Sequence, residues 1–373
     1  MKILAIETSC DETAAAVTQQ TAVLSNVIAS QIELHRRFGG VVPEIASRNH
    51  TLAIRNTVEE ALTAAGVGFA DIDAVAVTQG SGLLGALLVG VSYAKALAYA
   101  LKKPLFAVNH ILGHIAANHI ESPALPCGTV NGDAAPNLTP CGAGLTPPYI
   151  CLIASGGHTA VAKVTDFPGV PGAVEILGQT QDDAAGEAFD KIARAMGLPY
   201  PGGPEIERLA RLGKPVIELP HPLKAQKGFD FSFSGLKTAV INKLARGANP
   251  ADLAASFQKT AVTLMANAAV RAARAHSLNK IVIAGGVAAN TALRASLQRD
   301  GSQALAAAPL VGLLGSQSEL NKHTIVYYPQ LKYCTDNAAM IGVCAYFMAK
   351  AGVKPATLEL DAATSVTAGK RNA

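Results

Sequence analysis

Strand-like and helix-like runs of apolar residues alternate along this chain in two successive series. The first series predicts helices at 43–66 and 82–101 and strands at 3–7, 14–18, 73–79 and 104–108. The second series predicts strands at 149–155, 159–164, 175–180 and 280–287, the last followed by a helix. This alternation is typical of an α/β protein.

The two series begin alike. ILAIETSCDETAAAV, from residue 3, and CLIASGGHTAVAKV, from residue 151, both consist of a strand, a short polar turn and a second strand. Two such hairpins that face a common cleft could each present backbone N–H groups to a phosphate. Polar turn residues are ordinary in any hairpin, however, so the pattern alone leaves both interpretations open.

Two stretches interrupt the series. Residues 122–148 are dense in Pro, Gly and Asn and predict a flexible loop between the two halves, and residues 300–324 resemble an insertion. Cys127 and Cys141 lie in the first stretch, where reduced thiols are favoured over a disulfide. We therefore expect a first lobe at 1–121 and a second at 149–373.

Length and composition limit the possibilities further. At 373 residues the chain should form two domains or one duplicated unit, and the 16% of charged residues points to much buried surface or to partner interfaces. The net charge of +4 permits a polyanionic partner, but there is no long run of lysine and arginine. The six cysteines include no C-x-x-C pair and nothing resembles a secretory leader, so we expect a reducing cytoplasm.

The segment at 82–101 is about long enough to cross a bilayer. It contains Lys95 and follows a strand-like run. A buried core helix is therefore favoured over a membrane span.

The stretch NHILGHIAANH, residues 109–119, holds three of the nine histidines. On a helix His110 and His114 share a face and can reach one metal ion, whereas His119 points elsewhere. A metalloprotease of the H-E-x-x-H type needs a glutamate after the first histidine, and this position is Ile111. The spacing therefore predicts a metal pair without protease chemistry.

A third ligand is needed, and Asp336 in YCTDNAAMI is the best candidate because it lies between a strand-like and a helix-like run. Two histidines and one carboxylate leave positions on an ion open for a substrate oxygen. Cys334 is two residues away, but a packed thiol is favoured for it.

Glycine-rich turns follow two predicted strands. SGGH at 155–158 lacks the G-x-S-x-G elbow of a serine nucleophile, and its glycines instead allow close backbone approach to an anion. AGGVAAN at 284–290 repeats this arrangement, and its Asn290 could bond a base or ribose. The chain has no Walker A motif, which excludes P-loop chemistry.

The acidic segment DDAAGEAFDK holds four carboxylates. On a helix Asp183, Glu187 and Asp190 would share one face, which predicts either a solvated acidic face or a contact to ribose hydroxyls beside the PGGP turn at 201–204.

Together, these pieces resemble one known family. IETSCDET, GGVVPEIASRNH, NHILGH, IASGGHT, DDAAGEAFDK, PYPGGP, FDFSFSGLKT, AGGVAANTALR and CTDNAAMI occur in the order typical of the tRNA N6-adenosine threonylcarbamoyltransferase family, long labelled a sialoglycoprotein endopeptidase. The resemblance implies a duplicated ribonuclease-H-like fold of the actin and sugar-kinase superfamily, two lobes with a cleft between them. It also implies a helical insertion at about 180–275 and a C-terminal helix that returns to the first lobe.

The resemblance further implies a reaction and its residues. The threonylcarbamoyl group of threonylcarbamoyl-AMP would move to N6 of the adenosine 3′ to the anticodon in tRNAs that read ANN codons. His110, His114 and Asp336 would hold one Fe(II) or Zn(II), and Asp11 and Glu12 would be catalytic acids lining the cleft. The adenylate would contact nine residues: Ile153, Ala154, Ser155, Gly156, Gly157, Asp190, Gly203, Glu207 and Asn290.

The partners implied are tRNA, a non-catalytic paralogue and a small P-loop ATPase, with no membrane. Two alternatives remain at this point: an ATP-dependent kinase or ATPase of the same superfold, and a scaffold paralogue without activity. Candidate tRNA phosphate contacts are Arg36, Arg37, Arg48, Lys102 and Lys103.

Overall fold

The structure is a computed structural model. It describes the whole chain except residues 122–128, 131–132, 135–137, 141–143, 222–227, 304–323, 367 and 372–373.

The first sheet has five strands in the order β3-β2-β1-β4-β5. Their bounds are β1 (Lys2–Glu7), β2 (Glu12–Gln19), β3 (Ala22–Ser30), β4 (Ala74–Gly80) and β5 (Leu105–Asn109). The first three strands pair antiparallel, whereas β4 and β5 run parallel to β1.

The second sheet repeats this order in the series β11-β10-β9-β12-β13. Its strands are β9 (Tyr149–Ala154), β10 (Thr159–Val164), β11 (Val174–Gln179), β12 (Lys280–Ala284) and β13 (Ile325–Tyr328), with β14 (Lys370–Arg371) and β8 (Leu138–Pro140) at its edges. The strand directions also match those of the first sheet. The predicted duplication and the two predicted hairpins are therefore confirmed.

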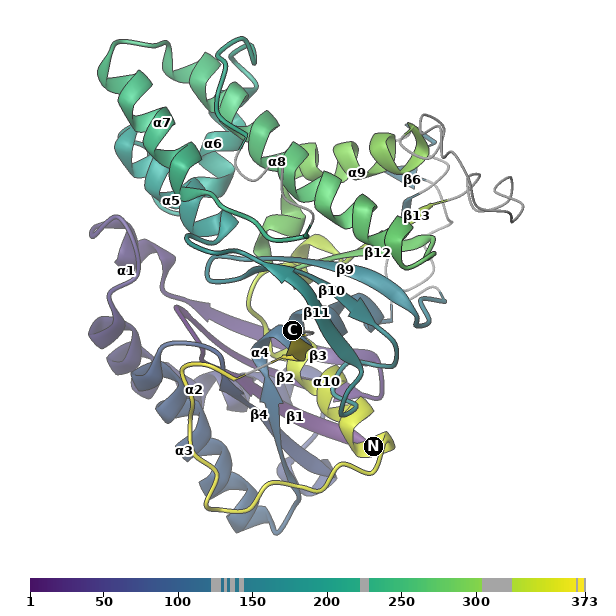
Figure 1. Cartoon of the computed structure of the whole chain (residues 1–373). Helices are drawn as coiled ribbons and strands as arrows, with labels where there is room; N and C mark the ends of the chain where they lie inside the picture. The colour runs from purple at the N-terminus through teal and green to yellow at the C-terminus, as the bar shows by residue number, and fades with distance from the viewer. Residues whose placement is uncertain are drawn as a thin grey trace.

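Helices and sheets alternate in layers through the molecule (Figure 1). Helices α2 (Pro43–Ala65) and α3 (Leu84–Leu101) cover the outer face of the first sheet, and α4 (His110–Ala116) and α10 (Ala338–Lys350) lie between the two sheets. The outer face of the second sheet carries α5 (Ala185–Ala195), α6 (Gly202–Ala210), α7 (Ser234–Ala245), α8 (Pro250–Ala275) and α9 (Thr291–Gln303). The short α1 (Ile32–Arg36) follows β3.

Strand β1 shows why the first sheet is buried on both sides. Successive side chains of a strand point to opposite faces, so Ile3 and Ala5 pack with α10 whereas Leu4 and Ile6 pack with α2 and α3. A continuous apolar run is the expected sequence of a strand covered by helices on both faces. The second sheet is covered in the same way, by α4 on one face and by the α5–α9 layer on the other.

The predicted helices at 43–66 and 82–101 are confirmed as α2 and α3. The stretch 122–148, predicted as a loop, contains three short strands: β6 (Thr129–Val130) pairs with β7 (Asp133–Ala134), and β8 pairs with β13 at the sheet edge. Cys127, Cys141 and most of the insertion at 300–324 lie outside the described residues. The lobe boundaries stay predictions, although α10 does pack on the first sheet.

Among the helices of the described residues, α3 is the one that is apolar enough and long enough to cross a membrane. Its inner face packs closely, because a Cβ on Gly90 would lie 2.3 Å from Thr8 Oγ1. Leu88 and Tyr99 are exposed on the same helix. The expected core helix is therefore confirmed for one face only.

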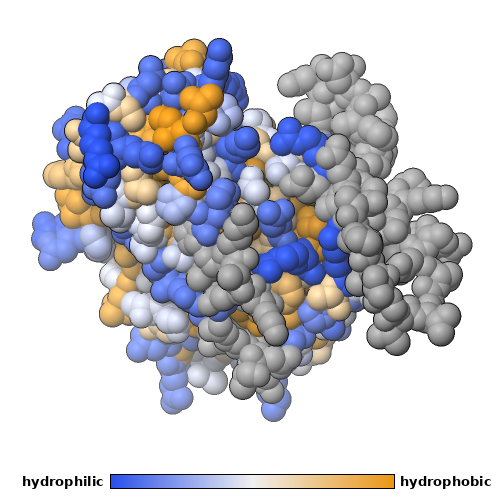
Figure 2. Space-filling view, turned by 45° about the horizontal axis from the view of Figure 1, so that its top comes forward, coloured by the Kyte–Doolittle hydropathy of each residue, from blue (hydrophilic) through white to orange (hydrophobic). Residues whose placement is uncertain are grey.

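Hydrophobic side chains also reach the surface elsewhere. On the face drawn in Figure 2, they form small patches between hydrophilic residues. Such scattered exposure is normal for a folded chain, so this face alone indicates no partner.

Candidate active site

Three side chains predicted as metal ligands come together between the sheets. Strand β5 ends at Asn109, whose side chain caps α4 by accepting from the N–H groups of Ile111 and Leu112. His110 and His114 follow one turn apart, with ring centroids separated by 4.5 Å. Asp336 precedes α10, and its Oδ1 lies 3.4 Å from His110 Nε2 and 3.2 Å from His114 Nε2.

These three residues fit a divalent transition-metal ion. One ligand atom from each lies within 4.8 Å of the others. Both ring nitrogens of His114 are buried and make no hydrogen bond within the described part of the chain, although Nε2 is close to Asp336. A buried nitrogen without a hydrogen bond is costly unless another partner satisfies it. Two imidazoles and a carboxylate with open positions form a common donor set for such ions.

Neighbouring cysteine and histidine residues are occupied elsewhere. Cys334 is buried, and its sulfur accepts a hydrogen bond from Arg294 Nη2 at 3.5 Å. The Nε2 of His119 lies 2.9 Å from the Tyr149 hydroxyl. The packed thiol agrees with the sequence prediction, and so does His119, which is buried against Tyr149 and is not part of the metal-ligand cluster.

Charge is tightly balanced at this cluster. Burial lowers the pKa of His110, but Asp336 and Glu7 outweigh it and raise that pKa to about 9. Burial and the neighbouring His110 lower the pKa of His114. Burial would raise the pKa of Asp336, yet the two histidines bring it down to about 2. The cluster therefore favours one positive charge beside the carboxylate, which a bound cation would also supply.

The first hairpin turn carries the two predicted catalytic acids. Asp11 is buried and accepts a hydrogen bond from the Tyr200 hydroxyl at 3.2 Å, and its pKa is raised by burial and by Asp336. Glu12 accepts from the Ser30 hydroxyl at 2.8 Å, and burial raises its pKa to about 7. An acid with a pKa near neutrality can exchange protons at physiological pH.

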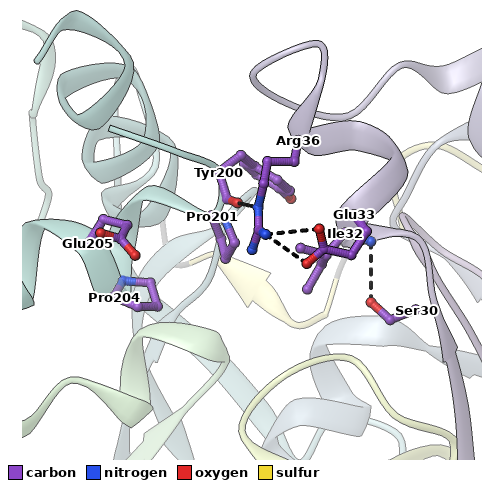
Figure 3. A pocket seen from close by; sticks show the side chains of 8 residues that line it. All are labelled: Ser30, Ile32, Glu33, Arg36, Tyr200, Pro201, Pro204 and Glu205. Atoms are coloured by element: carbon purple, nitrogen blue, oxygen red, sulfur yellow. Dashed lines mark hydrogen bonds and ion pairs between the residues drawn. The ribbon is translucent and has the colours of Figure 1, made fainter. Parts of the chain in front are cut away.

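A cavity of about 490 Å³ lies beside this turn, between α1 and the start of α6 (Figure 3). Arg36 projects into it, donates from Nε to the Tyr200 carbonyl at 3.1 Å and pairs with Glu33 at 2.7 Å. Arg36, a candidate tRNA phosphate contact from the sequence, is engaged here with two partners of the same chain. The cavity does not include the three metal-ligand candidates, and Tyr200 connects it to Asp11.

The glycine turns of the second lobe meet at the carboxyl ends of parallel strands. Ile153 and Ala154 end β9, and the neighbouring strand β12 ends at Ala284. Gly285 has a φ of +93°, and a Cβ there would lie 2.5 Å from Ala154 O. Only glycine permits this approach. The turn from Ser155 to Gly157 therefore lies beside the turn that leads to Asn290, at the edge where α/β sheets bind ligands.

Asp190, Glu207 and Asn290, three of the remaining predicted adenylate contacts, each form a hydrogen bond within the chain. Asp190 Oδ1 accepts from Gly202 N–H at 2.7 Å, beside Gly203, and burial raises the pKa of Asp190 to about 6. Glu207 accepts from the Thr291 hydroxyl, which places α6 beside the start of α9. Asn290 donates from Nδ2 to Gln258 Oε1 at 3.1 Å. Their contact with an adenylate stays a prediction.

The predicted acidic helix face is wrong. Helix α5 begins at Ala185, so Asp183 lies before it and pairs instead with Lys191 at 2.7 Å and Lys237 at 2.5 Å. Asp182 accepts from the backbone N–H of Phe233 at 2.7 Å. These two carboxylates fasten the segment before α7 onto α5.

Sequence reasoning missed three neighbours of the site. Glu7 is fully buried against His110, and Tyr200 contacts Asp11. His158 has its pKa lowered to about 4, first by burial and then by His110 and His114, so it belongs to the same electrostatic cluster. Glu7 could have been found, because a carboxylate at the end of an apolar strand needs a buried partner.

Comparison with known proteins decides the family. The model of the tRNA N6-adenosine threonylcarbamoyltransferase family matches residues 22–343. The chain belongs to this family. Curated members include one from Clostridium kluyveri, 47% identical over 100% of this chain and 99% of that protein. Another, from Moorella thermoacetica, is 50% identical over 92% of this chain and 91% of that protein.

Solved structures agree on the fold. HypF from T. kodakarensis superposes with a TM-score of 0.59 at 14% identity, over 94% of this chain and 48% of that one. Component A of (R)-2-hydroxyglutaryl-CoA dehydratase from Acidaminococcus fermentans gives a TM-score of 0.51 at 12% identity, over 94% and 99%. At these identities the likeness concerns fold alone. The chain has a two-lobed ribonuclease-H-like fold.

Family membership also decides the reaction class. The chain is a transferase of the tRNA-modifying kind, and the kinase or ATPase alternative is not favoured. A scaffold without activity is not favoured either, because the His110, His114 and Asp336 cluster is complete.

Proposed function

We propose that this enzyme transfers the threonylcarbamoyl group of threonylcarbamoyl-AMP to N6 of the adenosine 3′ to the anticodon in tRNAs that read ANN codons. The match to the transferase family across residues 22–343 carries this proposal. The His110, His114 and Asp336 cluster and the two adjoining glycine turns of the second lobe support it.

The chemistry explains why such a site is needed. The adenine N6 lone pair is delocalised into the ring, so N6 attacks the carbamoyl carbon only when that carbon is activated. The new C–N bond forms, the bond from this carbon to the phosphate oxygen breaks, AMP leaves and N6 loses a proton. The mixed anhydride supplies the leaving group, so no covalent enzyme intermediate is required.

We assign roles to the chain's own residues accordingly. Ile153–Gly157, Asp190, Gly203, Glu207 and Asn290 bind and orient the adenylate by backbone N–H groups and polar side chains. Asp11 and Glu12 lie in the first hairpin turn, where Glu12, with a pKa of about 7, is suited to hold the proton released from N6.

His110, His114 and Asp336 would hold one Fe(II) or Zn(II). Such an ion supplies positive charge that stabilises oxygens becoming negative during acyl transfer. The buried nitrogens of His114 and the mixed nitrogen and oxygen donors support this role.

The partners proposed are tRNA, a non-catalytic paralogue and a small P-loop ATPase, acting in the cytoplasm. The test combines the purified chain and both proteins with the adenylate-forming enzyme, threonine, bicarbonate, ATP and unmodified tRNA. Nucleoside analysis should detect threonylcarbamoyladenosine with the parent chain and lose it with His110→Ala. No modified nucleoside from the parent, when a relative succeeds in its place, would overturn the proposal.

A further inference from the structure

A fully buried carboxylate lies directly behind the candidate metal site. Glu7 ends β1 with no exposed surface, and its Oε2 lies 3.2 Å from His110 Nδ1. Asp336 approaches the other ring nitrogen of His110, Nε2. His110 is therefore held between two carboxylates, one on each nitrogen.

The Glu7 carboxylate is itself fixed. The Ser9 N–H donates to Oε1 and the Thr78 hydroxyl donates to Oε2, and each of these hydrogen bonds is 2.5 Å long. Ser9 belongs to the first hairpin turn and Thr78 to β4, so a backbone N–H of the turn and a side-chain hydroxyl of the neighbouring strand set the carboxylate position. The Ser9 hydroxyl also lies 3.2 Å from His110 Nδ1.

We propose that Glu7 is a positioning residue for the metal site: it accepts a hydrogen bond from His110 Nδ1–H and thereby fixes the tautomer whose Nε2 lone pair faces His114 and Asp336. An imidazole can bind a metal through either nitrogen, and the hydrogen bond at one nitrogen decides which lone pair is available. A carboxylate on the other ring nitrogen also makes the ligand more basic. The inference rests on the metal role proposed for His110.

The opposing interpretation is that Glu7 only stabilises the fold. Both interpretations expect a Glu7 variant to unfold more easily, so stability cannot separate them. Metal affinity can, because a purely structural carboxylate would leave the affinity of the folded variant unchanged.

The first experiment measures the dissociation constant for Zn(II) by competition with a chelating indicator. Glu7→Gln keeps the side-chain size but removes the charge, and its affinity should fall by about ten- to 100-fold. Asp183→Asn is the matched control, since it neutralises a mostly buried carboxylate that pairs with Lys191 and Lys237 and does not belong to the metal-ligand cluster. It should lose stability and keep the parent affinity.

The second experiment needs no Glu7 variant. In ¹⁵N spectra of the zinc-loaded parent, the His110 signal, assigned by its loss in His110→Gln, should show a protonated Nδ1 and a metal-bound Nε2. A protonated Nε2, or a folded Glu7→Gln with parent zinc affinity, overturns the inference about Glu7 alone. A parent chain that binds no zinc, iron or cobalt overturns the metal site and this inference together.

Discussion

The Tyr200 hydroxyl donates a hydrogen bond of 3.2 Å to Asp11 Oδ2, although the two residues are 189 positions apart along the chain. Tyr200 lies just before α6 of the second lobe, and Asp11 lies in the first hairpin turn. The same tyrosine accepts from Arg36 through its carbonyl. Tyr200 therefore connects the two predicted lobes beside Asp11, one of the proposed catalytic acids, and beside the cavity.

Replacing Tyr200 by Phe removes only this hydroxyl. The hydrogen bond lowers the pKa of Asp11 against the raising effects of burial and Asp336, so its loss should raise that pKa further. A hydrogen bond to a charged group contributes about 1.5 to 3 kcal/mol, so the acid limb of the pH–rate profile should move to higher pH by about one to two units. Tyr99→Phe, on the exposed face of α3, should leave the profile unchanged. An unmoved acid limb in Tyr200→Phe would show that Asp11 ionisation does not limit the rate.

Glu12 should make stability depend on pH. Its folded pKa of about 7 lies above its ordinary value of 4.5, so the folded state binds the proton more tightly than the unfolded state. The parent should therefore lose stability as pH rises from 4.5 to 7. Glu12→Gln cannot ionise, so its free energy of unfolding relative to the parent should increase over this window.

Urea unfolding at pH 5 and pH 8 measures this difference. Leu52→Gln, at an exposed position of α2, is the control: neither side chain ionises, so this variant should differ from the parent equally at both pH values. The same constant difference in Glu12→Gln would contradict the raised pKa. A gain in stability with a loss of transfer activity would indicate that Glu12 is present for function at a cost in stability.

The histidine motif offers an internal comparison for metal binding. His114 has two buried nitrogens without hydrogen bonds in the described chain, whereas His119 already pairs with Tyr149. His114→Gln should lose bound metal, measured by elemental analysis after dialysis, and its transfer activity should fall by about 100-fold or more, as expected when a charge-stabilising group is lost. His119→Gln should be less stable but keep its metal. Equal metal content in the two variants would exclude His114 as a ligand.

Features set by local geometry could be predicted from the sequence. The spacing of His110 and His114 follows from the helical repeat, and Asp336 follows from its place before a helix at a strand end. The two hairpins followed from apolar runs that flank short polar turns. Family resemblance supplied the roles of the adenylate contacts, which no local pattern could have given.

Other features depend on tertiary contacts or on an uncertain boundary. The contacts of Glu7 with His110 and of Tyr200 with Asp11 join residues more than a hundred positions apart. The prediction of a shared acidic helix face was wrong because α5 begins only at Ala185, after Asp183. Helix starts are among the least certain predictions from a sequence. β8 was missed because a three-residue edge strand is too short to show periodicity.

The start of α5 leads to a last prediction, at Gly186. A Cβ on this residue would lie 2.7 Å from Ser155 O and 2.8 Å from Gly156 Cα, so only glycine lets α5 approach the turn of the second hairpin. Gly186 N–H also donates to Ser155 O at 3.1 Å. Gly186→Ala should overpack this contact, cost about 1 to 3 kcal/mol in stability and displace the turn assigned to the adenylate.

Gly235→Ala is the matched control, because a Cβ there meets nothing within 4 Å and Gly235 lies on the exposed side of α7. This substitution should be neutral or slightly stabilising, since alanine has a higher helix propensity than glycine. Calorimetric titration with AMP should give at least a several-fold weaker affinity for Gly186→Ala and the parent affinity for Gly235→Ala. If folded Gly186→Ala binds AMP as the parent does, the turn from Ser155 to Gly157 does not contact the nucleotide, and the adenylate must lie elsewhere in the cleft.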